Sequence, residues 1–476
     1  MAEGLWVRTA ASASTRSGRV FSPHLDPSSA RFQLAAPAGD LAAMAEEAAH
    51  LALGRHSIVR RCTSRSPAAG LPQLSVHLAS GARRSAGPGE PRPMKDLVGM
   101  GVSDDPWESW IKATVEAVER YALSARHDPS TMLRAPYREV AESALPLRRF
   151  ALFSDHQYGS FPRMRLPSDD DEIDWTWAYS LTRDRFALVP AALAYATVSR
   201  RPPNNFSESL ISTGMACHVS VRAAVLAGLL EVVERDAVMV SWLNRRAATP
   251  ARPRPGTDLA GFVGEHFDLP DLDFVLIDLT VDTAIPVVGC LAFSRDPALP
   301  AATFGSAART DPAEAARKAL FEAAQILYVT HGFGWSARDE MAEADVHTIA
   351  DHARYYSGAS AASKLRALVS PDEEMWVDEI GGAGCVSGAA GGDDLEACVQ
   401  ALDAVGLEVL VVEVTTEDVA RCGFRAVRVL VPGAVDINGD VRYPRLGSHR
   451  IRAVPDALGW PAVPYERLNL GACPLA

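Results

Sequence analysis

A long apolar stretch near the middle of the chain predicts a buried helix. From Ser220 to Trp242 (SVRAAVLAGLLEVVERDAVMVSW), apolar residues occur on nearly every side of a 3.6-residue period, which is typical of a helix enclosed by protein. Glu231, Glu234 and Arg235 are spaced at i, i+3 and i+4 and therefore share one face. A buried carboxylate costs several kcal/mol unless cations or hydrogen bonds offset the loss of water. The helix therefore needs a counter-charge.

A second helix repeats this charge pattern. It is predicted from about Asp105 to Ser124 with Ser103 as its N-cap, and it carries Glu116, Glu119 and Arg120 in an apolar setting. One such pattern alone is more often an intrahelical salt-bridge set at a solvated edge. Two copies in buried helices favour four carboxylates that converge on Mg²⁺, with the arginines available for phosphate.

The rest of the pattern predicts a mixed fold. A third helix, Asp311–Tyr328, places Glu322 and Gln325 at i, i+3, either as a further polar spot on a buried face or as an ordinary polar pair. We interpret Pro250–Gly256 as a linker and residues 381–392 (GGAGCVSGAAGG) as a flexible loop. Further helices are predicted at Gly39–Leu53 and Leu395–Val405, and strands at Leu74–Leu78, Trp175–Ser180, Arg185–Ala192, Asp273–Leu279, Ile285–Phe293, Leu407–Val414 and Ala426–Val431. Alternating helices and strands indicate an α+β or mixed α/β fold.

Composition narrows the class of protein. The breaker-rich segment Arg84–Met94 predicts a boundary between a small N-terminal α/β region with its linker, residues 1–90, and a large domain, residues 91–476. No secretory signal and no uncharged apolar run of about 18 residues is found, and the net charge of −12 argues against nucleic acid or an anionic membrane as partner. Seven scattered cysteines without a CxxC spacing favour free thiols in the cytoplasm over disulfides or zinc. No Walker-type phosphate loop is present in the sequence.

A series of short motifs, each weak alone, runs through the chain in a fixed order. It comprises Gly99, Gly101, Ala113, Glu116, Glu119 and Arg120; Ser212, Gly214, Ala216, Gly228, Glu231, Glu234, Arg235 and Asp236; Asp278, Thr280, Ile285 and Pro286; Glu322 and Gln325; Asp351, His352 and Tyr356; Val431–Gly433; and Leu446, Gly447 and Arg450. Together, over roughly residues 91–476, the motifs resemble the YcaO superfamily, in the branch that forms the D-component of thiazole/oxazole-forming peptide maturases.

The resemblance implies a fold, a reaction and a set of site residues. The fold would have mixed β-sheets and long helices around a central nucleotide cavity. In the reaction, a Cys, Ser or Thr side chain of a ribosomal precursor peptide attacks the preceding amide carbonyl, the oxyanion takes the γ-phosphoryl group of ATP, and loss of phosphate leaves a thiazoline or oxazoline. The resemblance assigns Mg²⁺ to Glu116, Glu119, Glu231 and Glu234, catalytic roles to Glu234, Arg235 and Glu119, and nucleotide contacts to Glu116, Arg120, Glu231, Ser212, Thr213, Glu322, Gln325 and Lys112.

The chain also departs from the family pattern. Met100, Lys112, Thr213 and Leu327 replace a lysine, a serine, an asparagine and a basic residue. The tail Ala472–Ala476 has one proline where azoline-forming members end in P-x-P-x-P. These differences leave two alternatives to cyclodehydration: a relative that forms a thioamide or an amidine, and a catalytically impaired scaffold subunit. We interpret His352 and Tyr356 as structural.

The resemblance implies partners as well. We expect a precursor peptide as substrate, a separate leader-binding protein of E1-like or RRE type because residues 1–90 are short for such a domain, a flavin dehydrogenase, and a homodimer in the cytoplasm. The sequence names neither the peptide nor the ring.

Overall fold

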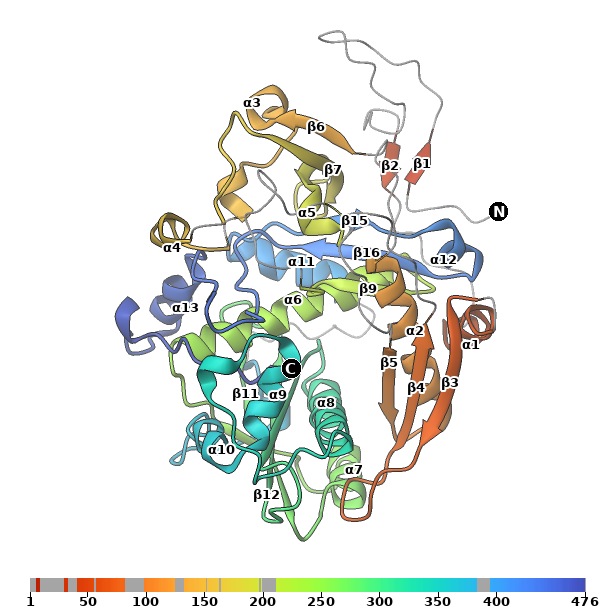
Figure 1. Ribbon diagram of the computed structural model, residues 1–476, viewed down its shortest axis with the longest axis vertical. Coiled ribbons are helices and arrows are strands. Elements are labelled where there is room, and N and C mark those ends of the chain that lie inside the picture. Colours follow the sequence, from red (N-terminus) through yellow and green to blue (C-terminus); the bar gives the residue numbers. More distant parts are fainter. Residues whose placement is uncertain are drawn as a thin grey trace.

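A single long helix, α6 (Val221–Leu243), runs through the middle of the protein (Figure 1). The computed structural model describes residues 6–8, 30–32, 41–54, 57–81, 98–124, 132–150, 152–161, 164–196, 198, 211–382 and 394–475. Sixteen residues of α6 are buried, including Glu234 and Asp236, so the prediction of an enclosed helix is confirmed. The Ser220 hydroxyl accepts a hydrogen bond from the Ala223 N–H and caps the helix.

One face of α6 packs on a six-stranded sheet. Ala216, Val427 and Val429 of this sheet share an apolar core with Leu229 and Val233 of the helix. The strands follow the order β6-β7-β15-β16-β9, with β8 also paired to β7, and all these pairings are antiparallel. The strands are β6 (Leu133–Pro136), β7 (Glu172–Ser180), β8 (Arg185–Pro190), β9 (Met215–His218), β15 (Leu410–Glu413) and β16 (Arg425–Leu430).

The opposite side of α6 faces a five-stranded sheet in the order β13-β12-β11-β10-β14. Phe304 of this sheet belongs to the same core as α6. Helix α8 (Pro312–Gly332) covers the sheet so closely that a Cβ on Gly305 would overlap backbone atoms of Ala319 and Ala323. The strands are β10 (Pro250–Arg252), β11 (Leu272–Asp278), β12 (Val287–Ser294), β13 (Ala302–Ala308) and β14 (Met375–Trp376).

A three-stranded antiparallel sheet carries the second glutamate helix, α2 (Pro106–Ser124). Its strands are β3 (Val59–Arg65), β4 (Ser75–Gly81) and β5 (Val98–Ser103). A Cβ on Gly99 or Gly101 would overlap the carbonyl oxygens of Ala113 or Ser109, so α2 rests directly on β5. Strands β4 and β5 pair although they flank the expected domain boundary, which stays a prediction because residues 82–97 lie outside the described part.

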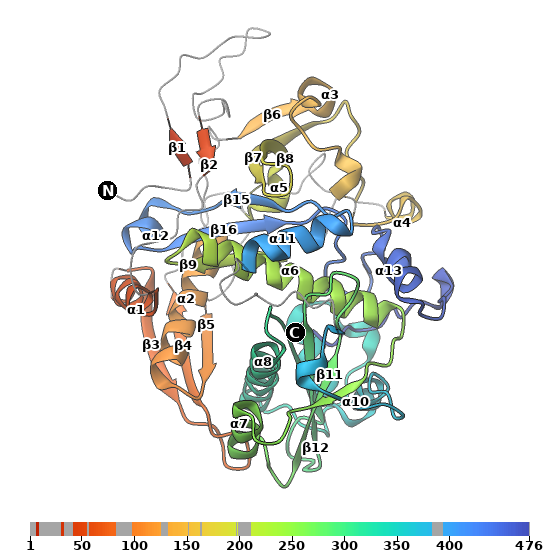
Figure 2. The same cartoon turned by 180° about the vertical axis from the view of Figure 1, so that it is seen from behind.

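Smaller elements complete the molecule, as Figure 2 shows from behind. A short ribbon pairs β1 (Trp6–Arg8) with β2 (Ala30–Phe32). No helix among the described residues is long and apolar enough to cross a membrane. The remaining α-helices are α1 (Leu41–Ala52), α3 (Tyr137–Val140), α4 (Asp155–Ser160), α5 (Ala191–Ala194), α7 (Asp258–His266), α9 (Ile349–Ser357), α10 (Ala359–Arg366), α11 (Asp394–Ala404), α12 (Glu417–Arg421) and α13 (Arg450–Leu458). Short 3-10 helices are η4 (Leu147–Phe150), η5 (Glu343–Asp345), η6 (Val377–Glu379) and η8 (Tyr465–Arg467).

Two local expectations are wrong. Pro250–Gly256 is not only a linker, because Pro250–Arg252 forms β10 between β11 and β14; proline is tolerated there as the first residue of the strand. Ser103 does not cap α2, since the Asp105 carboxylate accepts the N–H groups of Trp107 (2.7 Å) and Glu108 (2.9 Å). The glycine-rich loop falls largely outside the described residues.

Candidate active site

Glutamates from α2, α6 and α8 form one carboxylate cluster, although they are separated by up to about two hundred residues in the chain. The charge of Glu231 acts on Glu119, and the charge of Glu322 acts on Glu116 and on Arg235. The faces of α2 and α6 that carry the repeated pattern therefore lie close to each other. We call Glu116, Glu119, Glu231, Glu234 and Glu322 the carboxylate cluster.

The first glutamate of each repeat is held in the same way. Glu116 Oε2 accepts the N–H of Met100 at 2.6 Å, and Glu116 Oε1 pairs with Arg120 at 2.6 Å. Glu231 Oε2 accepts the N–H of Gly214 at 2.9 Å, and Glu231 Oε1 lies 3.6 Å from Arg235. In each case one oxygen is fixed by the backbone of a neighbouring strand or turn, and the other faces an arginine one helical turn later.

The second glutamate of each repeat is enclosed differently. Glu234 is only 5% exposed, and its Oε1 accepts the hydroxyl of Ser306 at 2.6 Å. No hydrogen bond of Glu119 is found among the described residues. Burial raises the pKa of the Glu119 carboxyl well above its ordinary value, and the charges of Glu231 and Glu116 raise it further. The charges of Arg120 and Lys318 act against this shift without offsetting it.

Burial also raises the pKa of Glu116 and of Glu231, even though Arg120 and Arg235 act against the shift. For Arg235, burial disfavours the charged form, but Glu234, Glu231 and Glu322 more than offset it, so its pKa lies above the ordinary value. The cations of the site thus do not fully offset the cost of burying its carboxylates.

Three residues that the sequence did not single out complete the site. Lys318 on α8 lies 3.5 Å from Glu322 and acts electrostatically on Glu116, Glu119 and Glu231. The charges of Glu234 and Glu322 act on Arg309, and the Ser306 hydroxyl donates a hydrogen bond to Glu234. Lys318 stands at i−4 from Glu322, a spacing that could have indicated it; Ser306 and Arg309 carry no comparable signal.

The carboxylate cluster fits a magnesium–nucleotide complex better than a bare ion. Among the described residues, no three His, Cys, Asp or Glu side chains are grouped closely enough to hold a metal alone. Mg²⁺ in nucleotide sites takes one or two carboxylates and completes its shell with water and phosphate oxygens. Glu116, Glu119, Glu231 and Glu234, the four glutamates assigned to Mg²⁺, would supply such ligands, and this assignment stays a prediction.

Other predicted site residues have interaction partners outside the carboxylate cluster, or none that is found in the described part of the chain. Thr213 is buried and donates to Asp436 Oδ1 at 2.7 Å, while Ser212 is exposed. Lys112 pairs with Glu108 at 3.0 Å and lies over the Phe321 ring. No hydrogen bond of the Gln325 side chain is found among the described residues. The nucleotide roles of Ser212, Thr213, Lys112 and Gln325 stay predictions.

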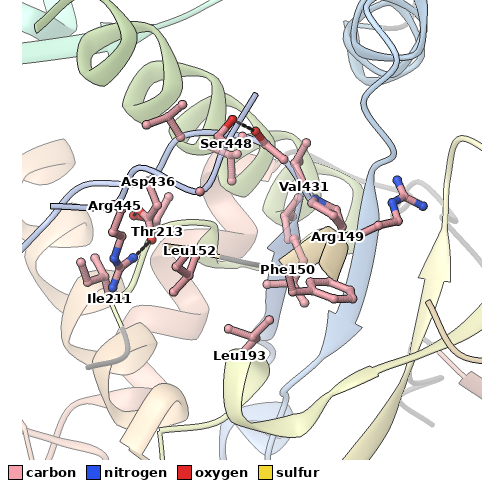
Figure 3. Close-up of a pocket in the computed structure, with 18 of the residues that line it drawn as sticks. Arg149, Phe150, Leu152, Leu193, Ile211, Thr213, Val431, Asp436, Arg445 and Ser448 are labelled. Carbon is pink, nitrogen blue, oxygen red and sulfur yellow. Dashed lines mark hydrogen bonds and ion pairs between the residues drawn. The ribbon is translucent and has the colours of Figure 1, made fainter. Parts of the chain in front are cut away.

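A pocket of about 300 Å³ is lined by Ile211 and Thr213 of the 211–214 turn, whose Gly214 N–H binds Glu231, and by Val232 of α6. Figure 3 shows Thr213, Asp436 and Arg445 together at one end, with Phe150 and Leu193 on other walls. The Arg149 side chain points away from this group. Strand β16, the 431–436 loop and η4 supply most of the lining. The pocket therefore adjoins the carboxylate cluster without containing its glutamates.

A buried ion pair anchors the 431–436 loop. Arg450 Nη2 lies 2.6 Å from Asp236 on α6 and 2.7 Å from Asp282. Asp236 also accepts the Val435 N–H at 2.8 Å. Burial opposes the Arg450 charge, but the two carboxylates offset it, and its pKa is raised. The sequence motifs around Asp236 and Arg450 thus meet as one structural contact.

The C-terminal segment is irregular, as expected, but buried. Ala472, Cys473 and Leu475 are at most 4% exposed. His352 Nδ1 lies 2.9 Å from the Cys473 carbonyl oxygen, and the Tyr356 hydroxyl donates to the Ala472 carbonyl at 2.5 Å. His352 and Tyr356 thus hold the C-terminal segment, and their interpretation as purely structural residues stays a prediction. Leu327 is also buried, in an apolar cluster with Leu71 and Leu299.

The protein has a mixed α+β fold in which the central helix and two other helices bring carboxylates into one site. This combination defines a protein of the metal–nucleotide-binding class. The family model described as YcaO cyclodehydratase, ATP- and Mg²⁺-binding, matches residues 100–435. The chain belongs to the YcaO family, and ATP and Mg²⁺ are the cofactors of that family. The family resemblance and the fold expected from the sequence are thereby confirmed.

Several proteins are similar to the chain. An uncharacterized protein of Methanothermobacter thermautotrophicus is 29% identical over 355 residues, which cover 72% of this chain and 82% of that protein. A heterocyclase in complex with substrate and cofactor matches with a TM-score of 0.71 and 23% identity, covering 90% of this chain and 56% of its own. The chain thus spans little more than half the length of that heterocyclase.

Two further structures share the fold. YcaO from Methanopyrus kandleri, bound with AMPPCP and Mg²⁺, matches with a TM-score of 0.59 and 18% identity, over 83% of this chain and 91% of that one. A chain of the E. coli microcin synthetase McbBCD complex with pro-MccB17 bound matches with a TM-score of 0.56 and 14% identity, over 87% of this chain and 96% of its own.

Proposed function

We propose that the protein is the cyclodehydratase subunit, the D-component, of a peptide maturase, and that it converts Cys, Ser or Thr of a precursor peptide into thiazoline or oxazoline. The observation that carries the proposal is the carboxylate cluster, in which burial and the charges of Glu231 and Glu116 raise the pKa of Glu119 although Arg120 and Lys318 act against the shift. The family description and the heterocyclase with the same fold support it.

In this proposal the chain's own residues position the bound nucleotide and neutralise its charge. ATP supplies, when bound with Mg²⁺, the phosphoryl group that turns the amide oxygen into a leaving group. Glu116 and Glu231 are fixed by the N–H groups of Met100 and Gly214, so their free lone pairs keep one direction. Arg235 interacts electrostatically with Glu234, Glu231 and Glu322, and it would also balance phosphate charge. Each ring removes one water from the peptide.

Substitution of Glu234 tests the proposal. Glu234→Gln keeps an amide oxygen for the Ser306 hydroxyl and removes the charge, so we expect the fold to persist and ATP turnover to fall at least about 100-fold. The measurement is phosphate release together with the peptide mass, which drops by one water per ring. Glu417→Gln, 81% exposed on α12, is the matched control and should keep full turnover.

The outcomes separate the alternatives. Phosphate release with exchange of the amide oxygen for sulfur would indicate a thioamide-forming relative. An amidine-forming relative would also remove one water, so fragmentation of the peptide must show whether the modified residue is a Cys, Ser or Thr or carries an amine. Peptide binding by the wild type without any phosphate release would make the chain a scaffold. Undiminished turnover in Glu234→Gln would refute the assignment of the site.

The similarity to a component of the McbBCD complex also supports a partner. We propose that a separate protein presents the leader peptide, that a flavin dehydrogenase acts on the azolines, and that the chain forms a homodimer.

A further inference from the structure

Lys318 brings a cation to the carboxylate cluster from the third helix. Its ammonium lies 3.5 Å from the carboxylate of Glu322, which is one turn further along α8. Its charge also acts on Glu116 and Glu119 of α2 and on Glu231 of α6. Lys318 is therefore close to carboxylates from all three helices that form the site.

The ammonium of Lys318 is held loosely. The side chain is 38% exposed, and no hydrogen bond of its ammonium is found in the described part of the chain. Arg120 is held more firmly, because it lies 2.6 Å from Glu116 and also donates to the carbonyl oxygen of Val98. A lysine on its flexible stem can leave a partly exposed ion pair without losing a fixed contact. The charge of Lys318 is therefore exchangeable.

The empty site needs a cation at this place. Burial disfavours the charged forms of Glu116, Glu119 and Glu231, and the charge of Lys318 acts against this effect for each of them. Mg²⁺ at the same carboxylates would bring two positive charges, and a nearby ammonium would repel it strongly where water is partly excluded. The lysine and the metal ion therefore compete for the same carboxylates.

We infer that Lys318 is the counter-ion of the carboxylate cluster in the nucleotide-free protein, and that Mg²⁺ takes its place when Mg·ATP binds. The inference rests on the proposed function, because it takes these carboxylates as the site of Mg·ATP. Glu322 remains a partner for the displaced ammonium, since the two residues are one turn apart on α8. The lysine thus suppresses binding of a free metal ion, and the metal enters together with the nucleotide, whose phosphate oxygens complete its shell.

The test is binding of Mn²⁺ alone to the full chain, measured by electron paramagnetic resonance. Mn²⁺ favours the same oxygen ligands as Mg²⁺. Lys318→Met should bind Mn²⁺ at least about fivefold more tightly than the wild type, because the repulsion of the ammonium is removed. The difference should shrink at high salt, which screens that repulsion. Lys318→Arg keeps the charge and should bind Mn²⁺ within about twofold of the wild type.

Two further variants support the comparison. Lys318→Gln also removes the charge but shortens the side chain, and it should show the same gain in Mn²⁺ binding if Lys318→Met fails to fold. Lys364→Met is the matched control, because Lys364 on α10 is 44% exposed and pairs with Glu343, which is not part of the carboxylate cluster. This control should bind Mn²⁺ as the wild type does.

Two results would overturn the inference. One is equal Mn²⁺ binding by the wild type and the uncharged variants of Lys318, or no Mn²⁺ binding by any of them. The other is binding of Mg·AMPPCP at least about fivefold weaker in Lys318→Met with unchanged Mn²⁺ binding, which would make Lys318 a ligand of the nucleotide phosphates. Failure of the proposed function would look different: the precursor peptide would lose no water, while the difference in Mn²⁺ binding would persist.

Discussion

Glu119 shows how one residue couples stability to ligand binding. Its carboxyl is buried beside Glu231 and Glu116, and the pKa is raised well above the ordinary value of 4.5. Below pH 4.5 both the folded and the unfolded chain hold the proton, and the residue costs nothing. As pH rises, the unfolded chain releases the proton first, so stability is lost progressively until the raised pKa is passed.

We therefore expect Glu119→Gln to raise the melting temperature of the nucleotide-free protein at pH 8 by about 2 °C or more, with a difference that shrinks towards pH 4.5. The same variant should lose the stabilisation that Mg·AMPPCP gives the wild type, because a charge ligand is gone. Thermal unfolding across pH, with and without Mg·AMPPCP, measures both effects. Glu265→Gln, 75% exposed, should change neither. A variant less stable than the wild type at pH 8 would contradict this account.

The residues of the site were predictable to different degrees. The E-x-x-E-R repeats identified Glu116, Glu119, Glu231 and Glu234 because their spacing puts charge on apolar helices. The N–H donors of Met100 and Gly214 were not predictable, since any residue type supplies a backbone N–H group. Met100 in place of a lysine therefore still leaves its N–H to hold Glu116.

Among the elements, the contact between β5 and α2 sets the position of the first glutamate pair. Gly101 has no room for a Cβ against the Ser109 carbonyl, so Gly101→Ala must move the helix away from the strand. We expect a loss of about 1–3 kcal/mol in unfolding free energy and at least tenfold weaker binding of Mg·AMPPCP, because Glu116 and Glu119 move with the helix. Denaturant unfolding and calorimetry measure the two effects.

Gly261→Ala on α7 is the control: its Cβ meets open space, and it should be neutral or slightly stabilising. Unchanged nucleotide affinity in Gly101→Ala would show that the contact does not position the site.

Element prediction succeeded where the apolar period was long. The helices α2, α6 and α8 were predicted to within a few residues, since three or more turns of periodic sequence override local breakers. Strand β10 was missed because proline and glycine at 250–256 read as turn signals, whereas its three residues are fixed by pairing with β11 and β14. Such short strands are determined by their neighbours and not by their own composition.

At the scale of the whole molecule, the site depends on contacts between distant segments. Strand β9 pairs with β16 across about two hundred residues, and Asp236 pairs with Arg450 across a similar span. No local pattern encodes such pairings, so the order of strands in the three larger sheets was not predictable from the chain. The carboxylate cluster could be proposed from repeated motifs, but the neighbouring pocket could not, since it forms only when β16, η4 and the 431–436 loop meet.

Recognition of the precursor peptide also concerns the molecule as a whole. The proposed function assigns presentation of the leader peptide to a separate protein. We therefore expect the chain alone to bind the leader of a precursor encoded beside its gene more weakly than micromolar. The partner encoded there should raise turnover of the full precursor at least tenfold, because tethering raises the local substrate concentration. Fluorescence anisotropy of a labelled leader and phosphate release measure these effects. A leaderless core peptide is the control, since its turnover should not respond to tethering. Leader binding at micromolar strength or tighter by the chain alone would place recognition within it.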